Sequence, residues 1–280
     1  MRVVAAREVK VYGERNTGTR ALVAAVEANF AVRLMAPSRR PKPAEIEAEV
    51  KRRKRFLAWG RPVREAIIDE ASEPLVDSDF GWKHAAPPLG AIARQPERAA
   101  RALFLVATKH PLFFLASLHR RPHHDLVRRW PAPNLSRFLR QRWRPVARDL
   151  VGTDDLASPV DLWRVKAEAY RRLIGAVPRA LHVRYEDFVA DYDGTLDRIA
   201  AALGEPSKTW ARPEPSTKGD ALGFEDYARK YDLANVGEGF FREDVAFVNA
   251  RLDPELLAFF GYAPIAPETR PRLPIGERLR

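Results

Sequence analysis

A glycine-containing loop near the N-terminus holds the first residues whose types and spacing could do chemistry. The loop, GERNTGT at 13–19, follows the β-branched run EVKVY at 8–12 and precedes a helical apolar pattern. A strand, a glycine loop and a helix in this order gather backbone N–H groups at a helix N-terminus, which can bind an anion. Triphosphate loops have the pattern G-x4-G-K-[ST], whereas here Gly18 is followed by Thr19 and Arg20. The loop therefore argues against a magnesium-dependent triphosphate site, and an ordinary strand-to-helix turn is the alternative interpretation.

The elements that must position this loop form an α/β pattern. Strands are expected within 8–12, 32–36, 101–110 and 179–188, and the continuous apolar run in 101–110 is typical of a central parallel strand. Helices are expected over 18–30, 44–72 with a break at 60–62, from 111 onward, near 135–143, 161–177 and 193–204, with pieces over 224–262. Residues 77–88 are expected to be a short strand or an extended segment. We predict a P-loop-type three-layer α/β/α fold with a central, mainly parallel sheet, helical insertions and a helical C-terminus.

The loop and later segments, in order along the chain, resemble the sulfotransferases that use 3′-phosphoadenosine 5′-phosphosulfate. GERNTGTRAL, at 13–22, looks like their 5′-phosphosulfate loop. The resemblance implies a phosphosulfate donor in place of a triphosphate, with no metal expected, and this would explain the missing lysine. It assigns the cofactor contacts of the loop to Arg15, Asn16, Thr17, Gly18, Thr19 and Arg20. Either Arg15 or Arg20 must supply the charge, because Asn16 stands where many family members have a basic residue.

Residues 109–117 resemble the 3′-phosphate motif of that family, R-[DN]-P-x5-S. Lys109 and His110 precede Pro111, and Ser117 follows Lys109 by eight positions. Lysine in place of arginine keeps the charge but loses the bidentate fork. The resemblance implies that Lys109 and Ser117 recognise the 3′-phosphate of the donor.

The segment WKHAAPP, at 82–88, resembles the Lys-(Thr)-His-x-Pro region of cytosolic sulfotransferases, where the histidine is the general base. Histidine suits this role because its ordinary pKa is near 6.5. The resemblance implies catalytic roles for His84 as the base, for Lys83 as a charge on the sulfuryl group, and for Arg15 in the loop. A hydrogen-bonded histidine without a catalytic role is the alternative interpretation.

Two further segments resemble parts of the donor site. LHVRYEDF, at 181–188, is similar to the family's strand–Tyr-Glu-Asp–helix segment, which implies that Tyr185 lies beside the nucleotide. Alternatively, the same residues anchor the exit of a strand. STKGD, at 216–220, is similar to a late Lys/Arg-Gly loop, which implies that Lys218 and Gly219 contact the 3′-phosphate.

The composition bounds the domain count, compartment and partners. A chain of 280 residues, 46% hydrophobic, can bury one large core, and we assign 1–262 to a single domain and 263–280 to a proline-rich arm. The chain has no cysteine, which excludes disulfides and thiolate metal sites. It has neither a signal-peptide-like start nor an apolar run of about 18–20 residues, so we expect a cytoplasmic protein without a transmembrane segment. The net charge of +11 favours anionic partners.

The predicted reaction is sulfuryl transfer from 3′-phosphoadenosine 5′-phosphosulfate to a hydroxyl or amine, releasing 3′,5′-adenosine bisphosphate. The acceptor class stays open among a sugar, a lipid, a phenol, a peptide and a small metabolite, and so does the oligomeric state. One alternative is a P-loop kinase or other nucleotide phosphotransferase. Another is an inactive protein on the same scaffold that binds anionic polymers through the basic run at 51–55, although no motif indicates a specific nucleic acid.

A histidine-rich stretch, SLHRRPHHDL, could serve a metal or an anionic acceptor. His119 and His123 have zinc-ligand spacing only if a helix continues through them, and the intervening Pro122 argues against that. Contact of Arg120, Arg121 or His123 with an anionic acceptor is the other hypothesis, and a solvated loop is the simplest interpretation.

Overall fold

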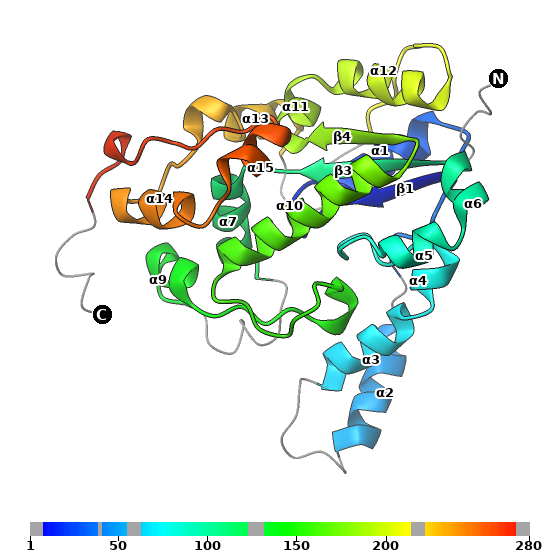
Figure 1. Cartoon of the computed structure of the whole chain (residues 1–280), viewed down its shortest axis with the longest axis horizontal. Helices are drawn as coiled ribbons and strands as arrows, with labels where there is room; N and C mark the ends of the chain where they lie inside the picture. Colours follow the sequence, from blue (N-terminus) through cyan, green and yellow to red (C-terminus); the bar gives the residue numbers. More distant parts are fainter. Residues whose placement is uncertain (1–7, 39–40, 55–62, 123–131, 214–221, 273–280) are drawn as a thin grey trace.

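The centre of the protein is a sheet of four parallel strands in the order β2-β1-β3-β4 (Figure 1). This computed structural model describes residues 8–38, 41–54, 63–122, 132–213 and 222–272. The strands are β1 Glu8–Tyr12, β2 Arg33–Leu34, β3 Ala102–Thr108 and β4 Ala180–Arg184. Tyr12 is in register with Val106, and Thr108 with Arg184, so the segments that follow these strands leave the same edge of the sheet.

Helices connect and cover the strands. In chain order they are α1 Thr19–Asn29, α2 Pro43–Lys54, α3 Val63–Ser72, α4 Leu75–Ser78, α5 Leu89–Ala93, α6 Pro96–Arg101, α7 Pro111–Arg120, α9 Leu135–Arg140, α10 Pro159–Ala176, α11 Tyr185–Ala190, α12 Tyr192–Leu203, α13 Phe224–Lys230, α14 Arg242–Asn249 and α15 Pro254–Phe259. The short 3-10 helices are η1 Ala147–Asp149, η2 Leu233–Asn235 and η3 Pro267–Thr269. No helix in these described ranges is long and apolar enough to cross a membrane.

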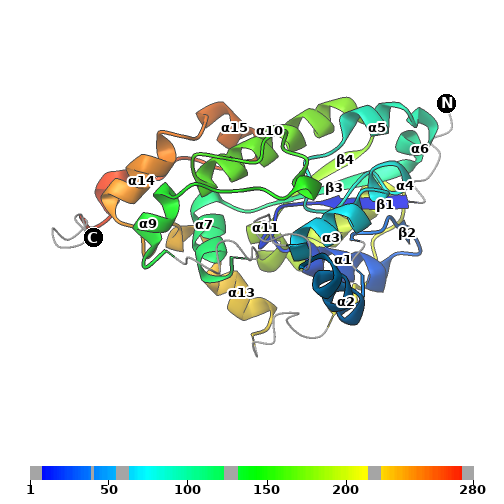
Figure 2. The ribbon, with the colours of Figure 1, turned by 90° about the horizontal axis from the view of Figure 1, so that it is seen from below.

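Alternate residues of the central strands face two separate apolar layers. Tyr12, Phe104 and Val106 belong to one buried cluster with residues of α7 and α10. Val11 and Leu105 belong to the other, with residues of α1, α11 and α12. Figure 2 shows the sheet between α10 and α5 on one side and α1 and α11 on the other. The predicted three-layer α/β/α class with a parallel sheet is therefore confirmed.

Several expected elements differ in their bounds. No strand forms over 77–88, because α4 extends to Ser78 and the chain then turns with left-handed backbone at Phe80 and Gly81. The strand expected over 179–188 ends at Arg184, since Tyr185 already begins α11. The helix expected over 193–204 begins one residue earlier, at Tyr192, and the Asp191 carboxylate caps α12 by accepting the Gly194 N–H.

Two buried side chains of β1 hold the segment that leads into residues 82–84. The Lys10 ammonium is fully buried and donates a hydrogen bond to the Gly81 carbonyl. Tyr12, also fully buried, donates its hydroxyl to the Phe80 carbonyl. Burial lowers the pKa of Lys10 to about 7. β1 therefore positions two walls of the site, one through the loop that follows it and the other through these side chains.

The described part of the C-terminal tail lies against α14. Arg242 donates its backbone N–H to the Pro271 carbonyl at 2.8 Å, and the Asn249 side chain donates to the Ile265 carbonyl at 2.9 Å. The Arg270 guanidinium donates to the Val236 carbonyl. The division into a domain at 1–262 and an arm at 263–280 stays a prediction.

Candidate active site

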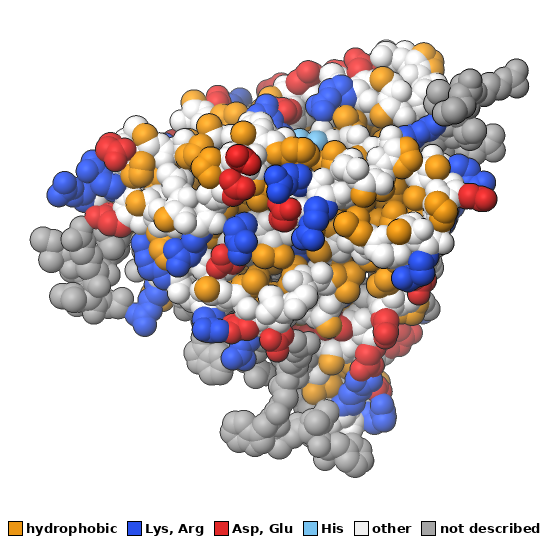
Figure 3. All heavy atoms as spheres, viewed as in Figure 1, with side chains coloured by type: hydrophobic (Ala, Val, Ile, Leu, Met, Phe, Trp, Pro, Cys, Tyr) orange, Lys and Arg blue, Asp and Glu red, His pale blue; other side chains and the backbone are white. Residues whose placement is uncertain are grey.

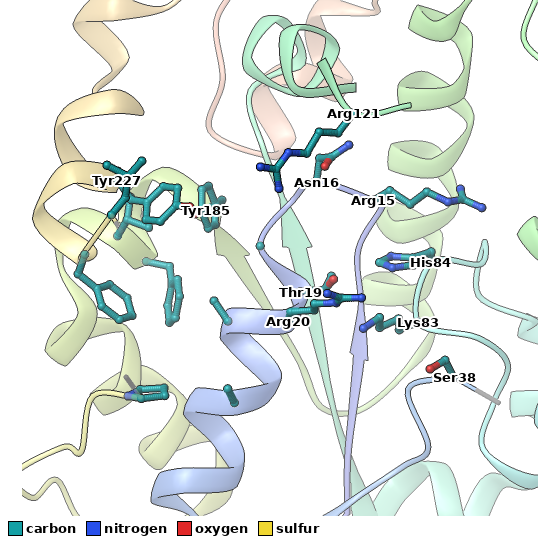
Figure 4. Close-up of a pocket in the computed structure, with 18 of the residues that line it drawn as sticks. Arg15, Asn16, Thr19, Arg20, Ser38, Lys83, His84, Arg121, Tyr185 and Tyr227 are labelled. Atoms are coloured by element: carbon teal, nitrogen blue, oxygen red, sulfur yellow. The ribbon is translucent and has the colours of Figure 1, made fainter. Parts of the chain in front are cut away.

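A cavity of about 950 Å³ lies beside the glycine loop, at the edge where the strands end (Figure 4). The loop, the start of α1, residues 82–84, α11 and α13 contribute to its wall. The predicted site residues in the wall are Arg15, Asn16, Gly18, Thr19, Arg20, Lys83, His84 and Tyr185. Thr17, Lys109 and Ser117 are buried and do not belong to the wall, and Lys218 and Gly219 lie outside the described residues.

The glycine loop is shaped by close packing at both of its glycines. A Cβ on Gly13 would lie 2.6 Å from the Ala107 carbonyl oxygen, and a Cβ on Gly18 would lie 2.0 Å from the Tyr185 ring. Gly18 also has a φ of 82°, in the left-handed region. It precedes α1 without a side-chain cap, and the first turn of α1 has no acidic residue. The helix N-terminus therefore presents its dipole and N–H groups to the cavity, as an anion site requires.

Arg15 belongs to a buried cluster of two acidic and two basic side chains. Its Nη1 lies 2.9 Å from Glu14 Oε1 and 3.1 Å from Asp149 Oδ1. Lys166 Nζ, from α10, lies 3.2 Å from Glu14 Oε2 and 3.2 Å from Asp149 Oδ1. Each of these side chains is at most 6% exposed. We call Glu14, Arg15, Asp149 and Lys166 the loop cluster, because their ion pairs join the glycine loop to η1 and α10.

His84 faces the cavity in a form that can accept a proton. Its Nδ1 lies 2.6 Å from the Gly13 carbonyl oxygen. Because a carbonyl only accepts hydrogen bonds, Nδ1 carries the proton and Nε2 keeps its lone pair. Desolvation lowers the pKa of His84 well below 6.5, and the positive charges of Arg15 and Lys83 act in the same direction. Lys166 of the loop cluster donates to the His84 carbonyl, so the cluster holds the backbone of His84 as well as the loop.

Lys83 and Arg20 are cations of the wall with no ion pair to a carboxylate within the described part of the chain. Lys83 is 9% exposed, whereas Arg20, in the first turn of α1, is exposed. Desolvation lowers the pKa of Lys83, and the charge of Arg20 lowers it further, so the two cations act on one region. Arg15, in contrast, is neutralised by its acidic neighbours.

Lys109 and Ser117 both contact Tyr231, and neither lines the cavity. Lys109 Nζ lies 4.3 Å from the centroid of the Tyr185 ring and 4.0 Å from that of Tyr231. Its side chain is fully buried, and Nζ has no hydrogen-bond partner among the described residues. Ser117 Oγ lies 3.5 Å from the Tyr231 hydroxyl. Burial lowers the pKa of Lys109 to about 7.

Sequence reasoning missed several residues that shape the site. Glu14 lies in the loop motif but was assigned no role, and Asp149 and Lys166 lie outside every segment that resembles the family. The only available signal was the acid next to Arg15 in the loop. No role was predicted for Trp82, yet the Arg15 and Arg148 guanidinium carbons each lie 4.7 Å from its ring centroid.

The fold and the site together define an α/β protein in which a glycine loop, a histidine with a lowered pKa and two cations without ion pairs among the described residues surround one cavity. Within the described ranges, no group of three or more His, Asp or Glu side chains could hold a metal ion.

Among known proteins, the similarities found are to solved structures. No protein-family model matches the chain, and no curated protein matches its sequence. The chain is similar to the sulfotransferase domain from the curacin biosynthetic pathway, with 13% identity and a TM-score of 0.44, over 89% of this chain and 98% of that one. It is similar to a sulfotransferase from Alicyclobacillus acidocaldarius at 16% identity and a TM-score of 0.45, with the same coverage of 89% and 98%. For sulfotransferase STF1 from Mycobacterium tuberculosis H37Rv the identity is 16% and the TM-score 0.40, over 82% and 77% of the two chains. All three of these solved structures are sulfotransferases.

The two arginines of the loop can be separated by substitution. Arg15→Gln leaves buried carboxylates of the loop cluster short of a partner, so we expect the free energy of unfolding to fall by about 3–5 kcal/mol. Arg20→Gln removes an exposed charge, so we expect a change within about 0.5 kcal/mol together with weaker binding of 3′,5′-adenosine bisphosphate. Urea unfolding measures the first quantity and isothermal titration calorimetry the second.

Two results would contradict these separate roles of Arg15 and Arg20. If Arg15→Gln folds as stably as the unsubstituted chain, the loop cluster does not hold the loop. If Arg20→Gln binds the nucleotide with unchanged affinity, Arg20 does not contribute charge to the anion site.

Proposed function

We propose that this protein is a sulfotransferase that moves the sulfuryl group of 3′-phosphoadenosine 5′-phosphosulfate to a hydroxyl or amine of a small-molecule or carbohydrate acceptor. One observation carries the proposal. A glycine loop without the triphosphate lysine, a histidine with an open Nε2, and the cations Lys83 and Arg20 line a single cavity. Transfer of a sulfuryl group requires three such features: backbone N–H groups that bind the donor anion, a base, and positive charge that stabilises the sulfuryl group as it moves.

The loop and its neighbours would hold the reacting end of the donor. The N–H groups at the start of α1 bind the 5′-phosphosulfate, and Arg20 supplies the charge that the sequence left open between two arginines. Lys83, whose charge interacts with that of Arg20, would stabilise negative charge on the sulfuryl oxygens. Electrostatic stabilisation of this kind is the main contribution in the related phosphoryl transfers.

The transfer step needs one proton acceptor. The acceptor oxygen or nitrogen attacks sulfur, the bond from sulfur to the bridging oxygen of the 5′-phosphate breaks, and 3′,5′-adenosine bisphosphate leaves. The proton of the attacking group passes to Nε2 of His84. Because Nδ1 is already bonded to the Gly13 carbonyl, the imidazole keeps its orientation as the proton arrives.

An aromatic part of the wall suits the adenine of the donor. Tyr185, Phe188, Phe224 and Tyr227 line the cavity from α11 and α13. The centroids of Phe188 and Phe224 are 5.8 Å apart, so these rings already pack together. Flat apolar surfaces stack on a purine without requiring a particular base edge, so this wall supports nucleotide binding, and the phosphate contacts must set the donor specificity.

Nucleotide selectivity tests the donor assignment. We expect 3′,5′-adenosine bisphosphate to bind without magnesium at least about tenfold more tightly than ADP, since a charge-assisted hydrogen bond to the 3′-phosphate contributes about 1.5–3 kcal/mol. Isothermal titration calorimetry with each nucleotide, in the presence and absence of magnesium, measures the difference.

Two other results would point to other functions. Tight binding of ATP only with magnesium would indicate a nucleotide phosphotransferase. Binding of a heparin-like polymer with a steep salt dependence and no nucleotide requirement would indicate a polymer-binding protein. The face of the molecule in Figure 3 has basic and acidic side chains interspersed, which is unlike the uniform basic stripe typical of such proteins.

The protonation of His84 can be followed directly. Because its pKa lies well below 6.5, we expect its ring to stay neutral from pH 8 down to 6.5 and to gain a proton only in more acidic solution. Proton NMR of the imidazole signals, assigned by their loss in His84→Gln, gives the midpoint. A midpoint at or above 6.5 would mean that the ring is not held neutral, and loss of nucleotide affinity in His84→Gln would indicate a binding role instead of a base.

A further inference from the structure

We propose that Arg121, at the end of α7, binds the 3′-phosphate of the donor, and that Lys109 does not contact it. This inference rests on the proposed function, since it concerns a donor that carries a 3′-phosphate. It departs from the motif, which assigns the 3′-phosphate to Lys109 and Ser117.

Lys109 is poorly placed to reach a ligand. Its ammonium is enclosed between the rings of Tyr185 and Tyr231, at 4.3 and 4.0 Å from their centroids. Its side chain is fully buried and belongs to no part of the cavity wall. Contact with a phosphate in the cavity would require one of the two rings to move. The cation–π contacts with these two rings explain the buried position of Lys109, which thereby supports Tyr185, a residue of the wall.

Ser117 is likewise outside the cavity wall. Its Oγ lies 3.5 Å from the Tyr231 hydroxyl, and the residue is only 7% exposed. Both residues of the motif therefore pack against Tyr231, which is itself buried and outside the wall.

Arg121 offers the missing charge at the wall itself. It lies four residues after Ser117, whose carbonyl accepts its backbone N–H at 3.1 Å, so it follows the motif by about one helical turn. The side chain is exposed and lines the cavity together with Asn16 and Tyr185. Figure 4 shows it reaching into the cavity from the end of α7.

Arg121 is also uncommitted and chemically suited to the ligand. No acidic side chain of the described residues pairs with it, whereas Arg148 pairs with Glu65 at 2.5 Å and Arg212 with Asp193 at 3.0 Å. An arginine fork can hold two phosphate oxygens at once, which a lysine ammonium cannot. The replacement of arginine by lysine in the motif is therefore compensated by an arginine one turn further along.

The test compares affinities for 3′,5′-adenosine bisphosphate and 5′-AMP, which differ only in the 3′-phosphate. We expect Arg121→Gln to lower the ratio of these affinities about 10- to 100-fold, while binding of 5′-AMP stays nearly unchanged. Arg121→Lys should retain part of the preference. Arg120→Gln, which removes the adjacent exposed arginine outside the cavity wall, is the matched control and should keep the ratio.

Lys109→Met completes the comparison, because methionine fills similar space between the rings without a charge. We expect the affinity ratio of this variant to remain within about twofold of the unsubstituted chain. A loss of preference in Lys109→Met equal to that in Arg121→Gln, or an unchanged ratio in Arg121→Gln, would overturn the proposal. If the unsubstituted protein itself shows no preference for 3′,5′-adenosine bisphosphate over ADP, the donor assignment fails first, and the role of Arg121 fails with it.

Discussion

The buried pairing of Glu14 and Asp149 with Arg15 and Lys166 is the interaction on which the site depends. Burying a carboxylate or a guanidinium is costly unless a partner of opposite sign and hydrogen bonds compensate it. Here the partners come from the glycine loop, from η1 and from α10, so satisfying the charges brings three distant parts of the chain together. Lys166 extends the same constraint to the backbone of His84. The loop cluster thus positions the glycine loop and the proposed base as one unit.

Backbone strain occurs in the same region. The only non-glycine residues with positive φ in the described ranges are Asn16, Phe80 and Leu150, at 67°, 55° and 53°. Asn16 lies in the loop, Phe80 precedes the segment of His84, and Leu150 follows an acid of the loop cluster. Such backbone costs of order 1–3 kcal/mol each and persists only where surrounding contacts enforce it. Asn16 lines the cavity, and the other two lie next to segments that position it, so the geometry of the site is held in advance of binding.

The sequence predicted the features that depend on local pattern. The parallel sheet, the glycine loop and the edge at which Lys83, His84 and Tyr185 meet follow from apolar runs and motif order. The loop cluster could not be predicted, because no spacing links Glu14 to acids and bases more than a hundred residues away. The enclosure of Lys109 depends on Tyr231, whose ring reaches it only through tertiary packing. Long-range charge pairing and ring packing therefore account for what sequence reasoning missed.

A crystal structure of the protein with 3′,5′-adenosine bisphosphate would test the central claim most directly. We expect the 5′-phosphate on the backbone N–H groups at the start of α1, beside Arg20, and the adenine against the aromatic wall of α11 and α13. His84 Nε2 should then face the empty space beyond the 5′-phosphate, where an acceptor would stand. A nucleotide bound away from the glycine loop, or no bound nucleotide at saturating concentration, would contradict the assignment of this cavity as a sulfuryl-transfer site.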